Sequence, residues 1–161
     1  MNRTLKWFLY TFLTGFAFYW TSNLLLWFPW SISASLGITL MLTLAPLLWV
    51  YAVYKCLLKF PGQQFFAAGF FIAIIFLFVA GLLDYLFFGL YRGAMEELYK
   101  PTTFYGYAFL LVLPFLEVLV VPKRLKRNRR PLILRNFLRM ALLGLITLGL
   151  LLVIIYFDVR I

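Results

Sequence analysis

The chain has 161 residues, of which 65% are hydrophobic and 12% are charged, with a mean hydropathy of +0.98 and a formal net charge of +10. Soluble domains carry about 25% charged residues, and a chain of this length cannot hide so much apolar surface from water. The composition therefore excludes a soluble globular domain and predicts an integral membrane protein whose outer surface faces lipid.

The sequence contains no histidine and a single cysteine, Cys56. Histidine-ligated haem, histidine-dependent nucleophile pairs, internal disulfides and multi-cysteine metal sites all need residues that are absent. No catalytic residue, metal or cofactor is therefore expected. The basic residues cluster between the apolar runs, which is typical of membrane topology and argues against nucleic acid as a partner.

Five apolar segments approach the length that a helix needs to cross a bilayer, roughly 20 residues. They predict an all-α bundle of five transmembrane helices in a single domain, 1–161, with helices at about 7–28, 36–54, 65–90, 104–121 and 136–157. Most prolines, Pro29 among them, fall between these segments. Pro46 and Pro114 lie inside the second and fourth segments and predict local kinks.

Lys and Arg are distributed unequally between the two alternating sets of loops and ends. One set holds twelve of them, including Arg3 and the run 123–130, whereas the other set holds only three: Arg92, Lys100 and Arg160. Because cytoplasmic loops are enriched in Lys and Arg, we expect the amino terminus in the cytoplasm and the carboxyl terminus outside, in a plasma or bacterial inner membrane. The first segment is too long for the apolar core of a cleaved signal peptide.

Asp84 interrupts the third segment. Gly69, Ala73, Ala80 and Asp84 share one helical face, and Gly69-x-x-x-Ala73 has the small-residue spacing that lets membrane helices approach closely. We therefore expect Asp84 to face other helices, with a polar partner on one of them. The carboxyl group is a candidate proton, cation or substrate-binding group, and the structural alternative is a packing hydrogen bond to a Thr, Tyr or Asn.

Glu117 is the second intramembrane acid and lies near the cytoplasmic end of the fourth segment. The structural interpretation is an ion pair with Lys123, Arg124 or Arg139, and the functional interpretation is one end of a proton path. Because local cations are expected to satisfy Glu117 while Asp84 lies deeper, Asp84 is expected to matter more for function.

The segment 92–103 is the densest polar stretch on the expected outer side. Arg92 and Glu96, and Glu96 and Lys100, are four residues apart, which predicts a short helix that ends at Pro101. Arg92, Glu96 and Glu97 are candidate binding residues of an outer gate or a headgroup-binding element. The alternative is a solvated helix at the membrane surface.

A run of basic residues precedes the last segment. It is expected to fix topology and to contact anionic lipid headgroups through Lys123, Arg124, Lys126, Arg127, Arg129 and Arg130. Cys56, beside Lys55 at the inner interface, is a candidate for acylation, although an unreactive thiol is the simpler interpretation.

These features favour a non-enzymatic membrane protein: a small transporter, a channel-like subunit or an accessory component of a membrane complex, with a homo-oligomer or a complex as its assembly. The alternative is a membrane-embedded enzyme acting on a lipid or lipid-linked substrate at the outer face, with Asp84, Glu96 and Glu97 as acid and base. A third possibility is a scaffold that recruits cytoplasmic partners through 123–130.

Overall fold

The structure is a computed structural model that describes residues 2–122 and 131–157, apart from the side chains of Trp30 and Ser31. Within these ranges the chain is all-α. The long helices are α1 (Arg3–Ile32), α2 (Ala34–Leu58), α3 (Phe65–Asp84), α4 (Pro101–Val120) and α6 (Leu134–Tyr156). Between α3 and α4 lie a π-helical segment, η1 (Tyr85–Tyr91), and a 3₁₀ segment, η2 (Met95–Tyr99).

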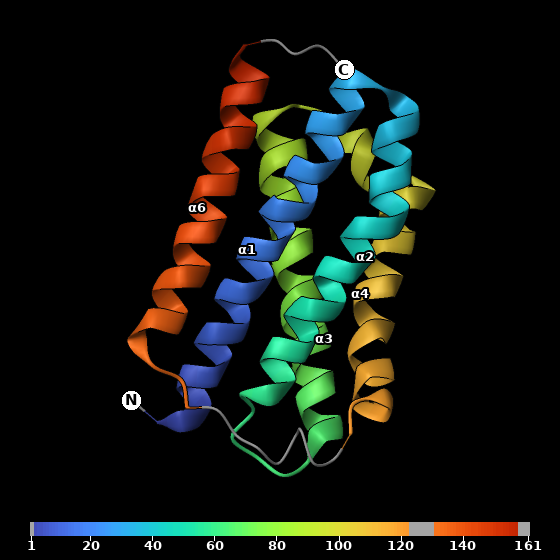
Figure 1. The fold of residues 1–161 in the computed structure, drawn as a ribbon. Coiled ribbons are helices and arrows are strands. Elements are labelled where there is room, and N and C mark those ends of the chain that lie inside the picture. Colours follow the sequence, from blue (N-terminus) through green and yellow to red (C-terminus); the bar gives the residue numbers. More distant parts are fainter. Residues whose placement is uncertain (1, 123–130, 158–161) are drawn as a thin grey trace.

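Helix α1 is the centre of the bundle. It packs against α2, α3 and α6, and α4 packs mainly on α3 (Figure 1). The inward faces of α1 carry buried Trp7, Thr11, Thr14 and Ala17, because this helix contacts protein on several sides. Because α1 contacts protein rather than lipid on these faces, it can carry polar and aromatic side chains there.

The other helices present apolar side chains outward. Leu47 is 63% exposed, Phe66 61% and Val120 79%, which an aqueous protein would not tolerate in such numbers. By length and composition, four helical stretches within the described residues are suited to cross a membrane: Ala34–Leu58, Phe65–Tyr91, Pro101–Val120 and Leu134–Tyr156. The chain is therefore a small multi-pass membrane protein.

The connection between α1 and α2 differs from the expected loop. Pro29 lies inside α1, not between helices, and only Ser33, in an extended conformation, separates the two helices. A proline near the end of a helix disturbs few hydrogen bonds, and the Pro29 carbonyl oxygen still accepts the N–H of Ser33 at 2.9 Å. The prediction that Pro29 lies between the first and second helices is wrong.

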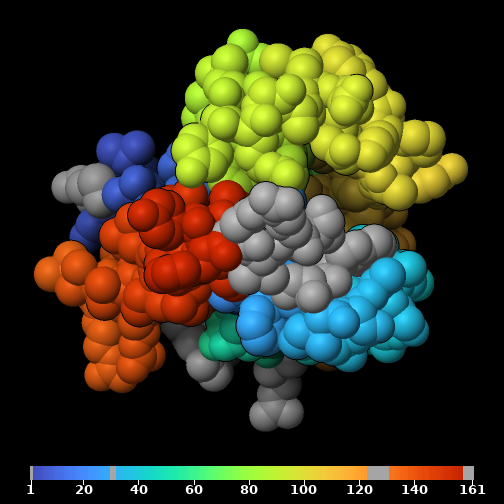
Figure 2. Space-filling model, turned by 90° about the horizontal axis from the view of Figure 1, so that it is seen from above, coloured from blue at the N-terminus to red at the C-terminus, as the bar shows by residue number. Residues whose placement is uncertain are grey.

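The third predicted helix, 65–90, also changes character before its end. The α-helix stops at Asp84, and Tyr85–Tyr91 continue as a wider π-helix. Gly93, with a φ of 64°, then reverses the chain into η2. Figure 2 shows this segment, residues 85–100, at one side of the upper end of the bundle.

Candidate functional site

The Asp84 carboxyl group accepts hydrogen bonds from two tyrosines on two other helices. The Tyr19 hydroxyl group of α1 donates to Asp84 Oδ1 at 2.5 Å, and the Tyr107 hydroxyl group of α4 donates to Asp84 Oδ2 at 2.6 Å. We call these three residues the tyrosine clamp. The clamp confirms the prediction that Asp84 faces protein and has a polar partner on another helix.

Small residues bring the three helices of the clamp together. A Cβ atom at Gly69 of α3 would lie 3.2 Å from Val118 Cγ2 of α4, and one at Gly15 of α1 would lie 3.1 Å from Phe76 Cδ1 of α3. Such distances leave little room for a side chain, so glycine permits the close approach. The clamp is therefore built into the packing of α1, α3 and α4.

The predicted outer site is not assembled around Asp84. The Arg92 guanidinium lies 4.2 Å from the ring centre of Trp27, and that ring stacks on Phe88 with centroids 6.2 Å apart. In the described part of the chain, no hydrogen bond or ion pair joins Arg92, Glu96 or Glu97 to Asp84. Their roles as acid, base and substrate-binding residues stay a prediction.

The ion pairs predicted for residues 92–100 are also different. Lys100 Nζ lies 2.6 Å from Glu97 Oε1, three residues earlier, and the expected pairs of Glu96 with Arg92 and Lys100 do not form. In a 3₁₀ helix side chains three residues apart eclipse, whereas the prediction assumed an α-helix, in which the spacing is four. Pro101 ends η2 as expected and also begins α4.

Glu117 is the more deeply buried of the two acids. Its exposed fraction is 7%, and neither carboxyl oxygen has a hydrogen-bond donor among the described residues. Arg139 makes no ion pair with Glu117 among the described residues, so that one of the three expected partners is wrong. The other expected partners, Lys123 and Arg124, lie outside the described residues, as do all six predicted lipid contacts in 123–130.

Small polar groups gather around the Cys56 thiol, which lies close to Glu117. The fully buried Cys56 thiol of α2 interacts electrostatically with the Glu117 carboxyl group and neighbours the hydroxyl groups of Thr11 and Thr14 on α1. Thr14 Oγ1 donates to the carbonyl of Tyr10 at 2.8 Å, whereas Thr11 Oγ1 has no partner among the described residues. We call Thr11, Thr14, Cys56 and Glu117 the inner polar cluster.

Trp7 covers the Cys56 side of this cluster. Its ring is fully buried, its Nε1–H donates to the Cys56 carbonyl oxygen at 2.9 Å, and it packs edge-on against Phe60 at 4.9 Å between centroids. Cys56 has no exposed surface in this arrangement, which removes the support for acylation.

Sequence reasoning missed the α1 partners at both positions. Trp7, Thr11 and Thr14 are spaced along one helical face, a polar pattern that marks the inward side of α1. That spacing was a usable signal for the inner polar cluster. Nothing comparable distinguished Tyr19 and Tyr107 from the other tyrosines of the chain.

A metal site is not suggested by the described residues, since no three His, Cys, Asp or Glu side chains gather within them. The arrangement offers instead a tyrosine clamp whose acceptors are both used, and an inner polar cluster with unused oxygen atoms. Comparison of the chain with protein-family models, curated proteins and solved structures finds no match in any of the three.

Proposed function

We propose that the chain is a non-enzymatic membrane protein that carries protons, as a small transporter or as the conducting subunit of a membrane complex. Glu117 is the group that takes up and releases the proton. The observation that carries this proposal is the burial of the Glu117 carboxyl group without a donor in the described part of the chain. Buried polar groups normally have partners, so such an exception calls for a functional explanation.

The cost of retaining this acid supports a functional role. An ionised acidic side chain costs roughly 2.5–3.5 kcal/mol at the centre of a membrane helix and less toward the helix end, where Glu117 lies. A glutamine or a leucine at position 117 would remove that cost without changing the packing greatly. The buried Thr11 hydroxyl group of the inner polar cluster has no geometric hydrogen-bond partner among the described residues, and it is a suitable relay for a proton or an ordered water.

Five crossings are part of the proposal, with the amino terminus in the cytoplasm of a cell membrane. Support comes from α1, whose 30 residues span about 45 Å at 1.5 Å per residue and whose axis runs beside the other long helices. The excess of Lys and Arg on one set of loops supports the orientation.

An outer lipid-modifying enzyme has less support. Both Asp84 oxygen atoms accept tyrosine hydrogen bonds, Glu97 pairs with Lys100, and Arg92 lies over Trp27. A general acid and base would have to act on one substrate from these separate positions.

Reconstitution tests the proton proposal. Purified protein is placed in liposomes that enclose a pH-sensitive dye, and a potassium diffusion potential drives protons inward. We expect flux above that of protein-free liposomes, a fall to that background in Glu117→Gln, and unchanged flux in Glu96→Gln, which alters an exposed acid. Flux at background in the unmodified protein, or full flux in Glu117→Gln, contradicts the proposal.

A further inference from the structure

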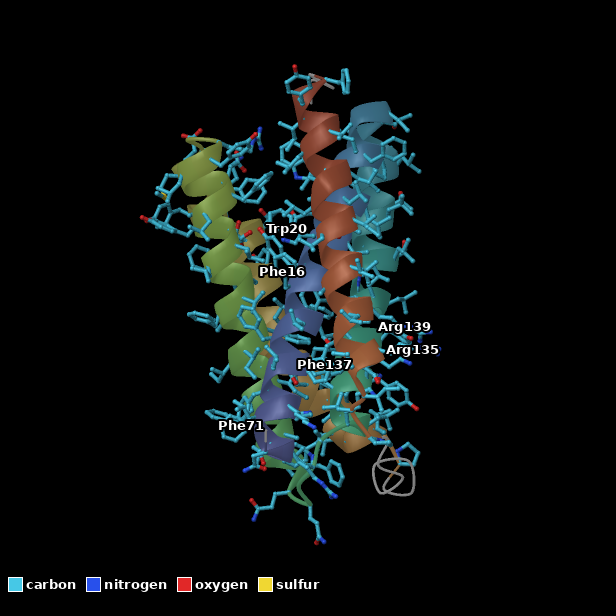
Figure 3. All side chains as sticks on the ribbon, turned by 90° about the vertical axis from the view of Figure 1, so that its left-hand side faces the viewer. Phe16, Trp20, Phe71, Arg135, Phe137 and Arg139 are labelled. Atoms are coloured by element: carbon cyan, nitrogen blue, oxygen red, sulfur yellow. The ribbon has the colours of Figure 1, made fainter. Side chains whose placement is uncertain are left out.

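A groove lies between α2 and α6, with α1 as its floor. It has a volume of about 450 Å³, and its walls include Tyr51 and Lys55 from α2, Asn136 and Arg139 from α6, and Tyr10 and Phe18 from α1. Arg135 and Arg139 point to the side of the bundle on which α2 lies (Figure 3). The groove is therefore a basic recess, separate from the tyrosine clamp and from the inner polar cluster.

Aromatic rings position the lysines that line the groove. Lys55 Nζ lies 4.8 Å from the ring centre of Tyr51, and Lys59 Nζ lies 5.4 Å from the ring centre of Tyr10. Cation–π contacts of this kind hold an ammonium group in place while its N–H groups remain able to donate. Arg139 faces them from α6. An anion in the groove would meet cations from two helices.

The electrostatic balance of the groove favours an anion further. No aspartate or glutamate is among its described lining residues, and no described acid forms an ion pair with Lys55 or Arg139. Pro131 and Asn136, at the amino-terminal end of α6, also line it, and the amino-terminal end of a helix attracts negative charge. The recognised group is one with a compact negative charge, such as a phosphodiester.

The rest of the lining and its surroundings are apolar. Phe18, Leu58 and Met140 contribute to the walls, and the outward faces of the two flanking helices carry Leu47, 63% exposed, and Leu138, 52% exposed. A soluble phosphate ion would gain nothing from such neighbours. A phospholipid would place its acyl chains beside them and its headgroup against the cations.

We propose that this groove binds an anionic phospholipid, with the headgroup phosphate at Lys55 and Arg139 and an acyl chain along Phe18 and Met140. Basic recesses between membrane helices on the cytoplasmic side are suited to this class of ligand. The site lies outside the basic run 123–130 and does not depend on proton transport by Glu117.

Native mass spectrometry of the full chain in detergent tests this site. The protein is titrated with phosphatidylglycerol or with phosphatidylcholine that carries the same acyl chains. We expect preferential binding of phosphatidylglycerol, weakened about fivefold by Lys55→Gln or Arg139→Gln and by more in the double variant. Lys55→Arg and Arg139→Lys should keep most of the affinity, which excludes misfolding as the cause.

A matched control is Arg92→Gln, which removes a cation at the other end of the bundle and should leave phosphatidylglycerol binding unchanged. In a further titration, inorganic phosphate is added in place of the lipid. Equal retention of both phospholipids, or unaltered phosphatidylglycerol binding in the double variant, overturns the proposal. If millimolar inorganic phosphate displaces bound phosphatidylglycerol as effectively as added phosphatidylglycerol does, the groove is a site for free anions, and the phospholipid proposal is overturned as well.

Discussion

The Tyr19 hydroxyl group lies 2.5 Å from Asp84 Oδ1, and this hydrogen bond links the central helix α1 to the end of α3 across 65 positions of sequence. Tyr107 makes the corresponding contact from α4 at 2.6 Å. Because both carboxyl oxygen atoms are occupied, the clamp resembles a packing element more than a site awaiting a ligand. Its expected contribution is to the stability of the bundle.

Removing either clamp hydroxyl group should destabilise the protein. Tyr19→Phe and Tyr107→Phe keep the ring and delete one donor to Asp84, so each is expected to lower the free energy of unfolding by about 1–2 kcal/mol. Reversible unfolding of the purified protein in mixed micelles measures the change. Tyr105→Phe is the matched control, because Tyr105 is 74% exposed. Equal stability of all three variants would show that the clamp contributes nothing.

The clamp also shows which part of the site could be predicted from the sequence. The spacing of Gly69, Ala73 and Ala80 placed Asp84 on a protein-facing side, since helical periodicity alone determines which residues share a face. The identity of the partners could not be deduced in this way. It depends on the relative rotation and depth of α1, α3 and α4, which are set by packing across distant parts of the chain.

The expected ion pair of Glu117 with Arg139 failed for a related physical reason. It considered the reach of one side chain toward basic residues, and ignored the helices that cover Glu117, which is only 7% exposed. The Cys56 thiol of α2 lies close to its carboxyl group. The π-helical segment η1, which follows α3, could not be predicted from the sequence either, because the apolar run 85–91 gives no local signal that separates α from π geometry.

A close contact between α1 and α6 gives a sharp packing test. A Cβ atom at Gly144 would lie 2.5 Å from Phe16 Cδ1 and 3.2 Å from the Ala17 Cα atom, whereas one at Gly149 meets nothing within 4 Å. Gly144→Ala should lower the free energy of unfolding by about 1–3 kcal/mol through overpacking. Gly149→Ala should leave it unchanged or raise it by up to about 1 kcal/mol, because alanine favours the helix.

The same micelle unfolding measurement compares the two glycine variants. The sign of their difference is the decisive quantity, since both changes add one methyl group to the same helix. Greater loss of stability in Gly149→Ala than in Gly144→Ala would place α6 differently against α1.

Topology can be mapped independently of any activity. Five crossings put an amino-terminal tag and a reporter after Lys59 on the cytoplasmic side, and reporters after Lys100 and Ile161 on the outer side. Paired phosphatase and fluorescent-protein fusions at each position report the two compartments. If α1 does not cross, the amino-terminal tag and the reporter after Lys59 will lie on opposite sides of the membrane. Cytoplasmic fluorescence after Ile161 would contradict the proposed orientation.

Glu117 and Asp84 should respond in opposite ways to neutral isosteres. Glu117→Gln removes a buried acid that has no described donor, so stability should be unchanged or raised by about 1 kcal/mol while proton flux falls to background. Asp84→Asn replaces one acceptor oxygen of the clamp by an amide, so stability should fall by about 1 kcal/mol while flux persists. Measuring micelle unfolding and liposome flux on the same preparations separates the two effects. Loss of flux in Asp84→Asn at full stability, with flux intact in Glu117→Gln, would move the proton-carrying role to Asp84.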